Sequence, residues 1–139
     1  MEDKNNNSKL VTHRGSCHCK AVTFRIENFS DILTVWKCNC SICIMKQNHH
    51  FIVPEKNMVI ESGEDKLTTY RFNTMIAKHL FCSICGVQPF YRPRSNPDGY
   101  GVTIYCIDKS TIKDIIWKEF DGNNWDQSFE KSNISCLSK

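Results

Sequence analysis

Three cysteines lie within six residues in the segment Cys38-Asn39-Cys40-Ser41-Ile42-Cys43. Thiols this close together are too crowded to form disulfides among themselves, and a bound cation favours their thiolate forms. The spacing therefore predicts a metal site with three sulfur ligands. Three ligands are one fewer than the tetrahedron that zinc prefers, and an open coordination position is typical of catalytic zinc.

Four further cysteines form two pairs, Cys17-His18-Cys19 and Cys82-Ser83-Ile84-Cys85. The second pair has the spacing of a zinc knuckle, and Gly86 permits the left-handed backbone that such a turn often needs. The first pair places both sulfur atoms on one face of an extended segment. Together the pairs predict a closed four-thiolate site, which is structural and contributes folding energy.

Alternatives to this division stay open. Cys106 or a histidine could close the three-cysteine site, and both ions would then be structural. The spacing alone does not distinguish zinc from an iron–sulfur cluster, and zinc is the metal that we predict. A redox role for Cys82 and Cys85 fits less well, since no strand–helix context surrounds the pair.

A zinc ion held by three thiolates is a weaker Lewis acid toward water than one held by three histidines, because the site keeps a net negative charge. It suits sulfur chemistry, since thiolate-rich zinc can bind a further thiol as thiolate. The cluster therefore predicts an enzyme that makes or breaks a C–S bond in a small thiol adduct. His49 and His50 follow the cluster, and either could be the base that takes a hydroxyl proton.

A loop interrupted by prolines offers groups that could bind the carboxylate of a peptide-like thiol: Arg92, Arg94, Ser95 and Asn96. A solvated loop without ligand is the alternative. His18 lies between two predicted ligands, and we expect its ring to point away from their ion. His79 precedes the knuckle, and we expect it to orient a ligand there or to pack.

The elements that position these residues are predicted to be mostly short strands. Alternating apolar and polar residues between turn signals favour strands at 21–26, 33–38, 49–53, 58–61, 67–72, 78–82, 88–91, 102–107 and 115–120. A helical turn is expected at 41–47 and a helix at 125–131. We thus predict a mainly β, metal-bound single domain of short antiparallel strands at 13–130, with a disordered lead-in at 1–12 and a tail at 131–139.

The composition narrows the class of protein. The 139 residues are 40% hydrophobic and 24% charged, which is typical of one globular domain. No apolar run is long enough to span a membrane and the chain starts with a polar segment, which favours the cytoplasm or nucleus, where thiols stay reduced. Seven thiolates and two zinc ions would bring the formal charge of +3 to zero, so the charge does not favour a nucleic-acid partner.

Taken together, these motifs resemble the glutathione-dependent formaldehyde-activating enzyme family, most closely the branch that includes centromere protein V. The matching segments are 15–19, 38–43, 46–54, 69–74, 81–88 and 91–97, and the resemblance spans about residues 13–130. It implies a β-tent fold clasped by zinc. It also implies a structural zinc on Cys17, Cys19, Cys82 and Cys85, and a catalytic zinc on Cys38, Cys40 and Cys43.

The activity that the resemblance implies is that of a carbon–sulfur lyase. Such an enzyme would join formaldehyde to a small thiol such as glutathione, giving S-hydroxymethylglutathione, or would catalyse the reverse. The alternative function is a non-enzymatic zinc module of the centromere protein V type, acting as a chromatin or microtubule adaptor. An enzyme should keep a concave pocket over the three-cysteine site, whereas an adaptor could close that site with a fourth protein ligand.

Overall fold

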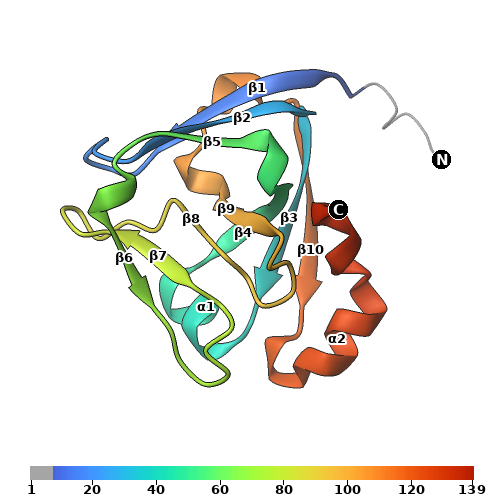
Figure 1. Ribbon diagram of the computed structural model, residues 1–139. Helices are drawn as coiled ribbons and strands as arrows, with labels where there is room; N and C mark the ends of the chain where they lie inside the picture. The colour runs from blue at the N-terminus through green and yellow to red at the C-terminus, as the bar shows by residue number, and fades with distance from the viewer. Residues whose placement is uncertain (1–7) are drawn as a thin grey trace.

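Three β-sheets of mostly antiparallel strands make up the computed structural model, which describes residues 8–139 (Figure 1). The first sheet has the order β1–β2–β5, from strands at Leu10–Ser16, Thr23–Ser30 and Met58–Ser62. The second has the order β10–β3–β4–β9–β8, from strands at Asp114–Phe120, Ile32–Cys38, His49–Pro54, Gly99–Thr103 and Phe90–Tyr91. The third pairs β6 (Leu67–Tyr70) with β7 (His79–Cys82). The predicted mainly β fold is confirmed.

Helices are short and lie between or after the strands. Helix α1 (Ser41–Lys46) connects β3 to β4, and α2 (Trp125–Ser132) follows β10 and lies beside it (Figure 1). Single 3-10 turns occur at Glu55–Asn57, Glu64–Lys66, Ile104–Cys106, Lys109–Thr111, Gly122–Asn124 and Ile134–Ser138. Within residues 8–139, no helix has the length and apolar character needed to cross a membrane.

The core forms where the first two sheets face each other. In β2, Phe24 and Ile26 are buried while Thr23 and Arg25 are half-buried, which is the alternation expected of a strand with one face inward. The Phe24 ring meets Phe90 edge-on, with 5.2 Å between centroids. Strand β4 is buried on both faces, because a second cluster of Trp36, Ile52, Phe120 and Ile134 covers its other side, with Trp125 and Phe129 of α2 packed against it.

The structure differs from the sequence prediction at three elements. Strand β1 begins at Leu10, inside the predicted lead-in 1–12, of which residues 1–7 lie outside the described part of the chain. Strand β10 runs parallel to β3, whereas every other strand pair is antiparallel. The strand predicted at 102–107 ends at Thr103, after which the chain turns into Ile104–Cys106.

The predicted tail at 131–139 packs against the rest of the domain. Asn96 is fully buried, and its Nδ2 donates to the carbonyl of Ile134 at 3.0 Å and to Oγ of Ser138 at 2.8 Å. Ile134 and Ser138 are themselves buried. These long-range hydrogen bonds, together with the apolar contact of Ile134, hold a segment that looks polar when it is considered alone.

Candidate metal centres and the adjoining cavity

The four-cysteine cluster joins two turns that are far apart in the sequence. Cys17 and Cys19 lie in the connection from β1 to β2, while Cys82 ends β7 and Cys85 lies in the turn after it. The four Sγ atoms lie within 4.8 Å of one another. The cluster therefore ties the β6–β7 ribbon to the β1–β2 hairpin, as the spacing predicts.

The geometry of this cluster fits a tetrahedral zinc ion. Zinc–sulfur bonds of about 2.3 Å place the sulfur atoms of a tetrahedron about 3.8 Å apart. In the structure, Sγ of Cys19 lies 3.7 Å from Sγ of Cys17 and 3.7 Å from Sγ of Cys82. Backbone N–H groups of Val22 and Ile84 donate to Cys17 and Cys82 at 3.4 Å, which stabilises thiolate sulfur. His18 is exposed between its two neighbours.

The three-cysteine cluster forms where β3 passes into α1. Cys38 ends β3, Cys40 is the N-cap of α1, and Cys43 is buried within the helix. Their Sγ atoms lie within 4.8 Å of one another, and among residues 8–139 no further cysteine, histidine or carboxylate joins them within that distance. Cys106 lies in another part of the fold, where its thiol faces the carbonyl of Gln88. The cluster can therefore hold a metal ion with a position to spare.

The surroundings of the three thiols support this interpretation. Hydrogen bonds from Cys38 and Cys43 lower the pKa of Cys40 to about 2, so these thiols share their protons unequally. Asn48 Nδ2 lies 3.5 Å from Sγ of Cys43, in position to donate to it. Gly122 lies so close that an added Cβ would be 2.6 Å from Cβ of Cys40 and 2.9 Å from Sγ of Cys38. Only glycine allows the loop after β10 to close over the cluster in this way.

A cavity of about 520 Å³ opens onto the three-cysteine cluster. Aromatic side chains form much of its wall, and several polar groups face it. The lining includes Cys38, Cys40, Cys43, His50, His79, Tyr91, Arg94 and Ser95, together with Trp36, Phe72, Phe120 and Trp125. A concave site that combines aromatic walls with polar groups beside a metal-ligand cluster is typical of an active site.

The two neighbouring histidines have different surroundings, because consecutive residues of a strand point to opposite faces. His50 is buried and lines the cavity. His49 instead packs against Trp117 and lies 2.7 Å, through Nδ1, from the hydroxyl of Tyr105. Of the two predicted bases, only His50 is therefore placed beside the cluster.

The hydrogen-bond partners of His50 determine which of its ring nitrogens carries the hydrogen. Its Nδ1 lies 3.2 Å from the carbonyl of Asn48, which can only accept, so Nδ1 bears the hydrogen. Its Nε2 is then an acceptor, and the hydroxyl of Tyr91 donates to it at 3.2 Å. Burial lowers the pKa of His50 to about 4 and raises the pKa of Tyr91 well above its ordinary value. Both groups are consequently neutral near pH 7.

Tyr91 is the residue of this site that sequence reasoning missed. Its ring stacks on His79, with 5.1 Å between centroids and an interplanar angle of 13°. His79 faces the cavity rather than the knuckle, because it lies three residues from Cys82 in β7 and so projects from the opposite face. No local pattern marks Tyr91, since its partner His50 is 41 residues away in the sequence.

Two residues of the predicted substrate-binding loop line the cavity, and the other two make contacts elsewhere in the fold. Arg94 lines the cavity with its guanidinium 3.7 Å from the Trp125 ring centroid and 3.6 Å from Asp126, and Ser95 lies beside it. Arg92 is directed elsewhere and contacts Glu55, Tyr100 and the carbonyl of Gly99. Asn96 holds the C-terminal segment, as described above. The structure thus places Arg94 and Ser95, but not Arg92 and Asn96, in the lining of the cavity.

Replacing Asn96 with alanine is expected to affect stability rather than substrate binding. The change removes three buried hydrogen bonds, two that Nδ2 donates and one that Oδ1 accepts from Ser95, so we expect the free energy of unfolding to fall by about 2–3 kcal/mol. Urea denaturation followed by tryptophan fluorescence measures this loss. The exposed Asn123 is the matched control, and Asn123→Ala should change the free energy by less than about 0.5 kcal/mol. An Asn96→Ala protein with unchanged stability would contradict the structural role.

Comparison with known proteins gives concordant results. The family model described as "Glutathione-dependent formaldehyde-activating enzyme" matches residues 12–120. A curated relative from Talaromyces marneffei, named "Putative glutathione-dependent formaldehyde-activating enzyme", is 27% identical over 107 residues. The aligned region covers 74% of this chain and 56% of that protein, so the chain spans about half the length of this relative.

A solved structure shares the fold. The crystal structure of a Rhodobacter sphaeroides protein superimposes with a TM-score of 0.62 at 31% sequence identity, and the match covers 76% of this chain and 99% of the other. The family model covers well over half of the chain and includes all seven clustered cysteines. The chain therefore belongs to the glutathione-dependent formaldehyde-activating enzyme family.

Proposed function

We propose that this chain is a zinc-dependent enzyme of the carbon–sulfur lyase type, which makes or breaks the bond between formaldehyde and a small thiol such as glutathione. The observation that carries the proposal is the cavity over a cluster of three thiols that no fourth cysteine, histidine or carboxylate of residues 8–139 completes. The name of the family and that of the Talaromyces marneffei relative support the same two substrates. That this chain belongs to the centromere protein V branch of the family stays a prediction.

We assign zinc to both clusters, with a structural ion on Cys17, Cys19, Cys82 and Cys85 and a catalytic ion on Cys38, Cys40 and Cys43. The sulfur separations of 3.7 Å in the first cluster support this metal. When bound to the second cluster, zinc would supply a coordination position that holds a substrate thiol as thiolate. Asn48 orients Cys43 through its amide hydrogen bond, as an outer partner of a metal ligand commonly does.

The reaction needs one proton to move at the substrate oxygen. In the forward direction, the thiolate sulfur forms a bond to the carbonyl carbon of formaldehyde, the C=O π electrons move to oxygen, and that oxygen takes up a proton. In the reverse direction, the hydroxyl loses its proton, C=O forms again, and sulfur leaves with the electrons of the C–S bond. The net proton balance is zero, because the thiol gives up the proton that the oxygen receives.

Tyr91 and His50 can relay this proton. The Tyr91 hydroxyl lines the cavity and donates to Nε2 of His50, so it can accept a substrate proton while its own passes to the imidazole. Because burial keeps the pKa of His50 near 4, Nε2 is unprotonated and ready to accept near pH 7. The carbonyl of Asn48 holds Nδ1–H and fixes the ring orientation throughout. We therefore assign the base to His50, with Tyr91 between it and the substrate.

The rest of the cavity positions the thiol and excludes water. Its aromatic walls from Trp36, Phe120 and Trp125 reduce solvent contact with the reacting atoms. Arg94 is the cation that lines the cavity next to Ser95, and a substrate carboxylate could replace its contact with exposed Asp126. Of the predicted substrate-binding residues, we retain Arg94 and Ser95.

Removing the Tyr91 hydroxyl is expected to slow the reaction without weakening thiol binding. Tyr91→Phe preserves the ring that stacks on His79, yet it interrupts the relay to His50, and we expect turnover to fall about a hundredfold. NMR exchange spectroscopy of formaldehyde with glutathione measures the rate. Tyr105→Phe is the matched control, since it removes the hydroxyl from His49, and it should leave the rate unchanged. Equal losses in both variants would exclude the relay.

Cobalt substitution tests the proposed function directly. Cobalt in the three-cysteine cluster should show visible bands that shift when glutathione is added, because a further sulfur would enter its coordination. The same protein should catalyse exchange between formaldehyde and the glutathione adduct. An unchanged spectrum together with absent catalysis would favour the non-enzymatic adaptor over the enzyme.

A further inference from the structure

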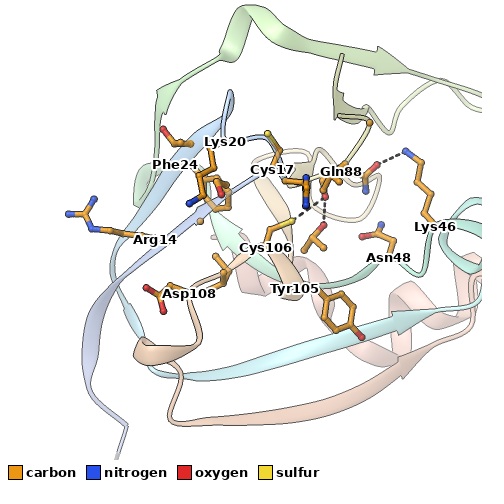
Figure 2. A pocket seen from close by; sticks show the side chains of 18 of the residues that line it. Arg14, Cys17, Lys20, Phe24, Lys46, Asn48, Gln88, Tyr105, Cys106 and Asp108 are labelled. Carbon is orange, nitrogen blue, oxygen red and sulfur yellow. Dashed lines mark hydrogen bonds between the residues drawn. The ribbon is translucent and has the colours of Figure 1, made fainter. Parts of the chain in front are cut away.

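A second cavity, of about 960 Å³, lies at the end of helix α1, where Lys46 lines it (Figure 2). The turn after β1, the end of α1 and the segments around Gln88 and Cys106 enclose it. None of its lining residues lines the three-cysteine cavity. The proposed thiol chemistry therefore makes no use of this space.

Two buried amide side chains in this cavity have unpaired hydrogen-bonding atoms. Gln88 is 8% exposed and Asn48 is 3% exposed. Within residues 8–139, Nε2 of Gln88 and Oδ1 of Asn48 have no hydrogen-bond partner. A buried polar atom without a partner destabilises the fold, and a bound molecule that pairs with it would remove that cost.

The orientation of both amides is fixed by their other contacts. Gln88 Oε1 accepts from Nζ of Lys46 at 2.9 Å, and the Gln88 carbonyl accepts from Oγ1 of Thr103 at 2.7 Å. Asn48 Nδ2 is directed to Sγ of Cys43. Figure 2 shows the amide ends of Gln88 and Asn48 facing each other at the same end of the cavity, close to Lys46. A donor and an acceptor thus face each other across this end of the cavity.

Their complement is a peptide group. The C=O and N–H of a trans peptide point in opposite directions, so a peptide group between the two amides can accept from Nε2 of Gln88 and donate to Oδ1 of Asn48. Lys46 donates to Gln88 with only one of its three N–H bonds, so it can also bind a carboxylate.

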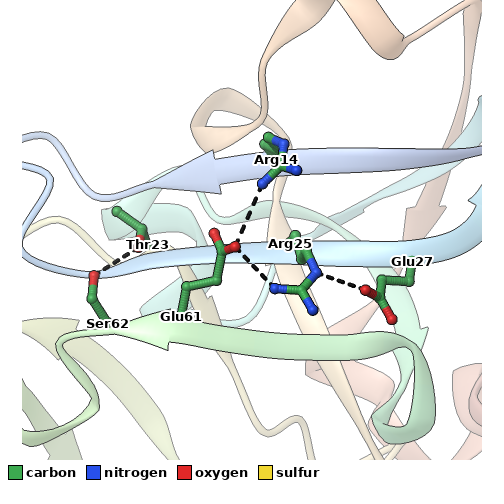
Figure 3. A network of polar contacts seen from close by, with 6 residues as sticks. All are labelled: Arg14, Thr23, Arg25, Glu27, Glu61 and Ser62. Carbon is green, nitrogen blue, oxygen red and sulfur yellow. Dashed lines mark hydrogen bonds and ion pairs between the residues drawn. The ribbon is translucent and has the colours of Figure 1, made fainter.

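The charges around the cavity favour one carboxylate over a more highly charged anion. Lys20 also lines the cavity, whereas Arg14 pairs with Glu61, which in turn pairs with Arg25 (Figure 3). The Asp108 carboxylate also lines the cavity, and its negative charge opposes a more highly charged group such as phosphate.

We propose that this cavity binds a short peptide with a free C-terminal carboxylate, through Gln88, Asn48 and Lys46. The site lies outside both cysteine clusters, and it shares only Asn48 with the proposed lyase site. Such a peptide could be glutathione itself or the C-terminus of another chain, since both offer the same amide and carboxylate. Its occupant would contact Asn48, the same side chain that contacts Cys43.

The test uses the zinc-loaded full chain and S-methylglutathione, a tripeptide that has no thiol. Titration is followed by the side-chain amide signals of Gln88 and Asn48 in ¹⁵N NMR and by calorimetry. We expect both signals to shift, and we expect Gln88→Glu to weaken binding about tenfold, because it removes the donor and repels the carboxylate while it retains the Lys46 contact. Ala-Gly is the second probe, and comparable binding of it would assign the site to peptide C-termini in general.

A control variant and a comparison of ligands distinguish this proposal from its alternatives. Gln127→Glu adds the same charge on exposed α2, outside both cavities, and should bind S-methylglutathione as the unchanged chain does. Equal effects of the two variants would overturn the proposal, as would binding of inorganic phosphate but not of S-methylglutathione. Shifts confined to Arg94 and Ser95 would place the peptide in the three-cysteine cavity and would also overturn it. Catalysis measured with glutathione and formaldehyde reports separately on the proposed function.

Discussion

Replacing Cys82 with serine is expected to unfold the domain. The side chain is fully buried, and Cys82 joins the β6–β7 ribbon to the β1–β2 hairpin through the four-cysteine cluster. Structural zinc in small domains contributes about 10–16 kcal/mol of apparent binding energy, whereas a domain of this size is stable by only about 5–15 kcal/mol. Loss of one zinc ligand can therefore remove most of the free energy of unfolding of the domain. Circular dichroism and metal analysis of the purified variant measure the result.

The control for this substitution is already present in the chain. Cys136 is exposed and lies outside both clusters, so Cys136→Ser should leave metal content and the melting temperature unchanged. A two-stranded ribbon such as β6–β7 is marginal by itself, which is why its attachment to the hairpin matters. A Cys82→Ser protein that melts at the temperature of the unchanged chain would show that the cluster has no structural role.

Sequence reasoning located the two clusters because metal-ligand spacing is local. Two residues between Cys82 and Cys85, and one between Cys17 and Cys19, restrict where the sulfur atoms can point before the rest of the fold is known. Most strands were predictable for a similar reason, since alternation in segments such as β2 is visible within a few residues.

The elements that sequence reasoning missed depend on distant partners. Strand β1 offers little apolar alternation, because its one fully buried residue is His13, whose ring nitrogens contact Thr111 at 2.8 Å and the carbonyl of Ser30 at 2.8 Å. Asn96 looks like a loop residue until Ile134 and Ser138 pack against it. These roles arise from pairings 17 to 98 residues apart, which no local pattern encodes.

The two candidate bases, His49 and His50, show what a local sequence pattern can and cannot predict. The adjacent His49 and His50 both follow the cysteine cluster, and the sequence could not choose between them. Strand alternation requires that they face opposite sides, but the choice of side depends on which face of β4 meets Tyr91. Proximity to the cluster was thus predictable, whereas the identity of the base required the fold.

Replacing Cys40 with serine is expected to remove one metal ion per chain and leave the domain folded. Cys40 is the N-cap of α1, has no capping hydrogen bond from its side chain, and is only half-buried. Serine is among the preferred N-cap residues, so the helix should be retained while the cluster loses one of its three sulfur atoms. We expect metal content to fall from about two ions to about one, because four-thiolate and three-thiolate sites bind separately.

Catalysis should be lost together with this ion. Without the third thiolate, the cluster cannot hold metal and substrate sulfur together, and we expect turnover to fall at least about a hundredfold. Elemental analysis, thermal melting and the formaldehyde–glutathione exchange assay are measured on the same preparation, with Cys136→Ser as the control. Unfolding of Cys40→Ser would make its ion structural, and full activity with one metal ion would remove the reaction from this cavity. The opposite responses expected of Cys82→Ser and Cys40→Ser follow from position, because one cluster joins two separate sheets and the other lies where a single strand passes into a helix.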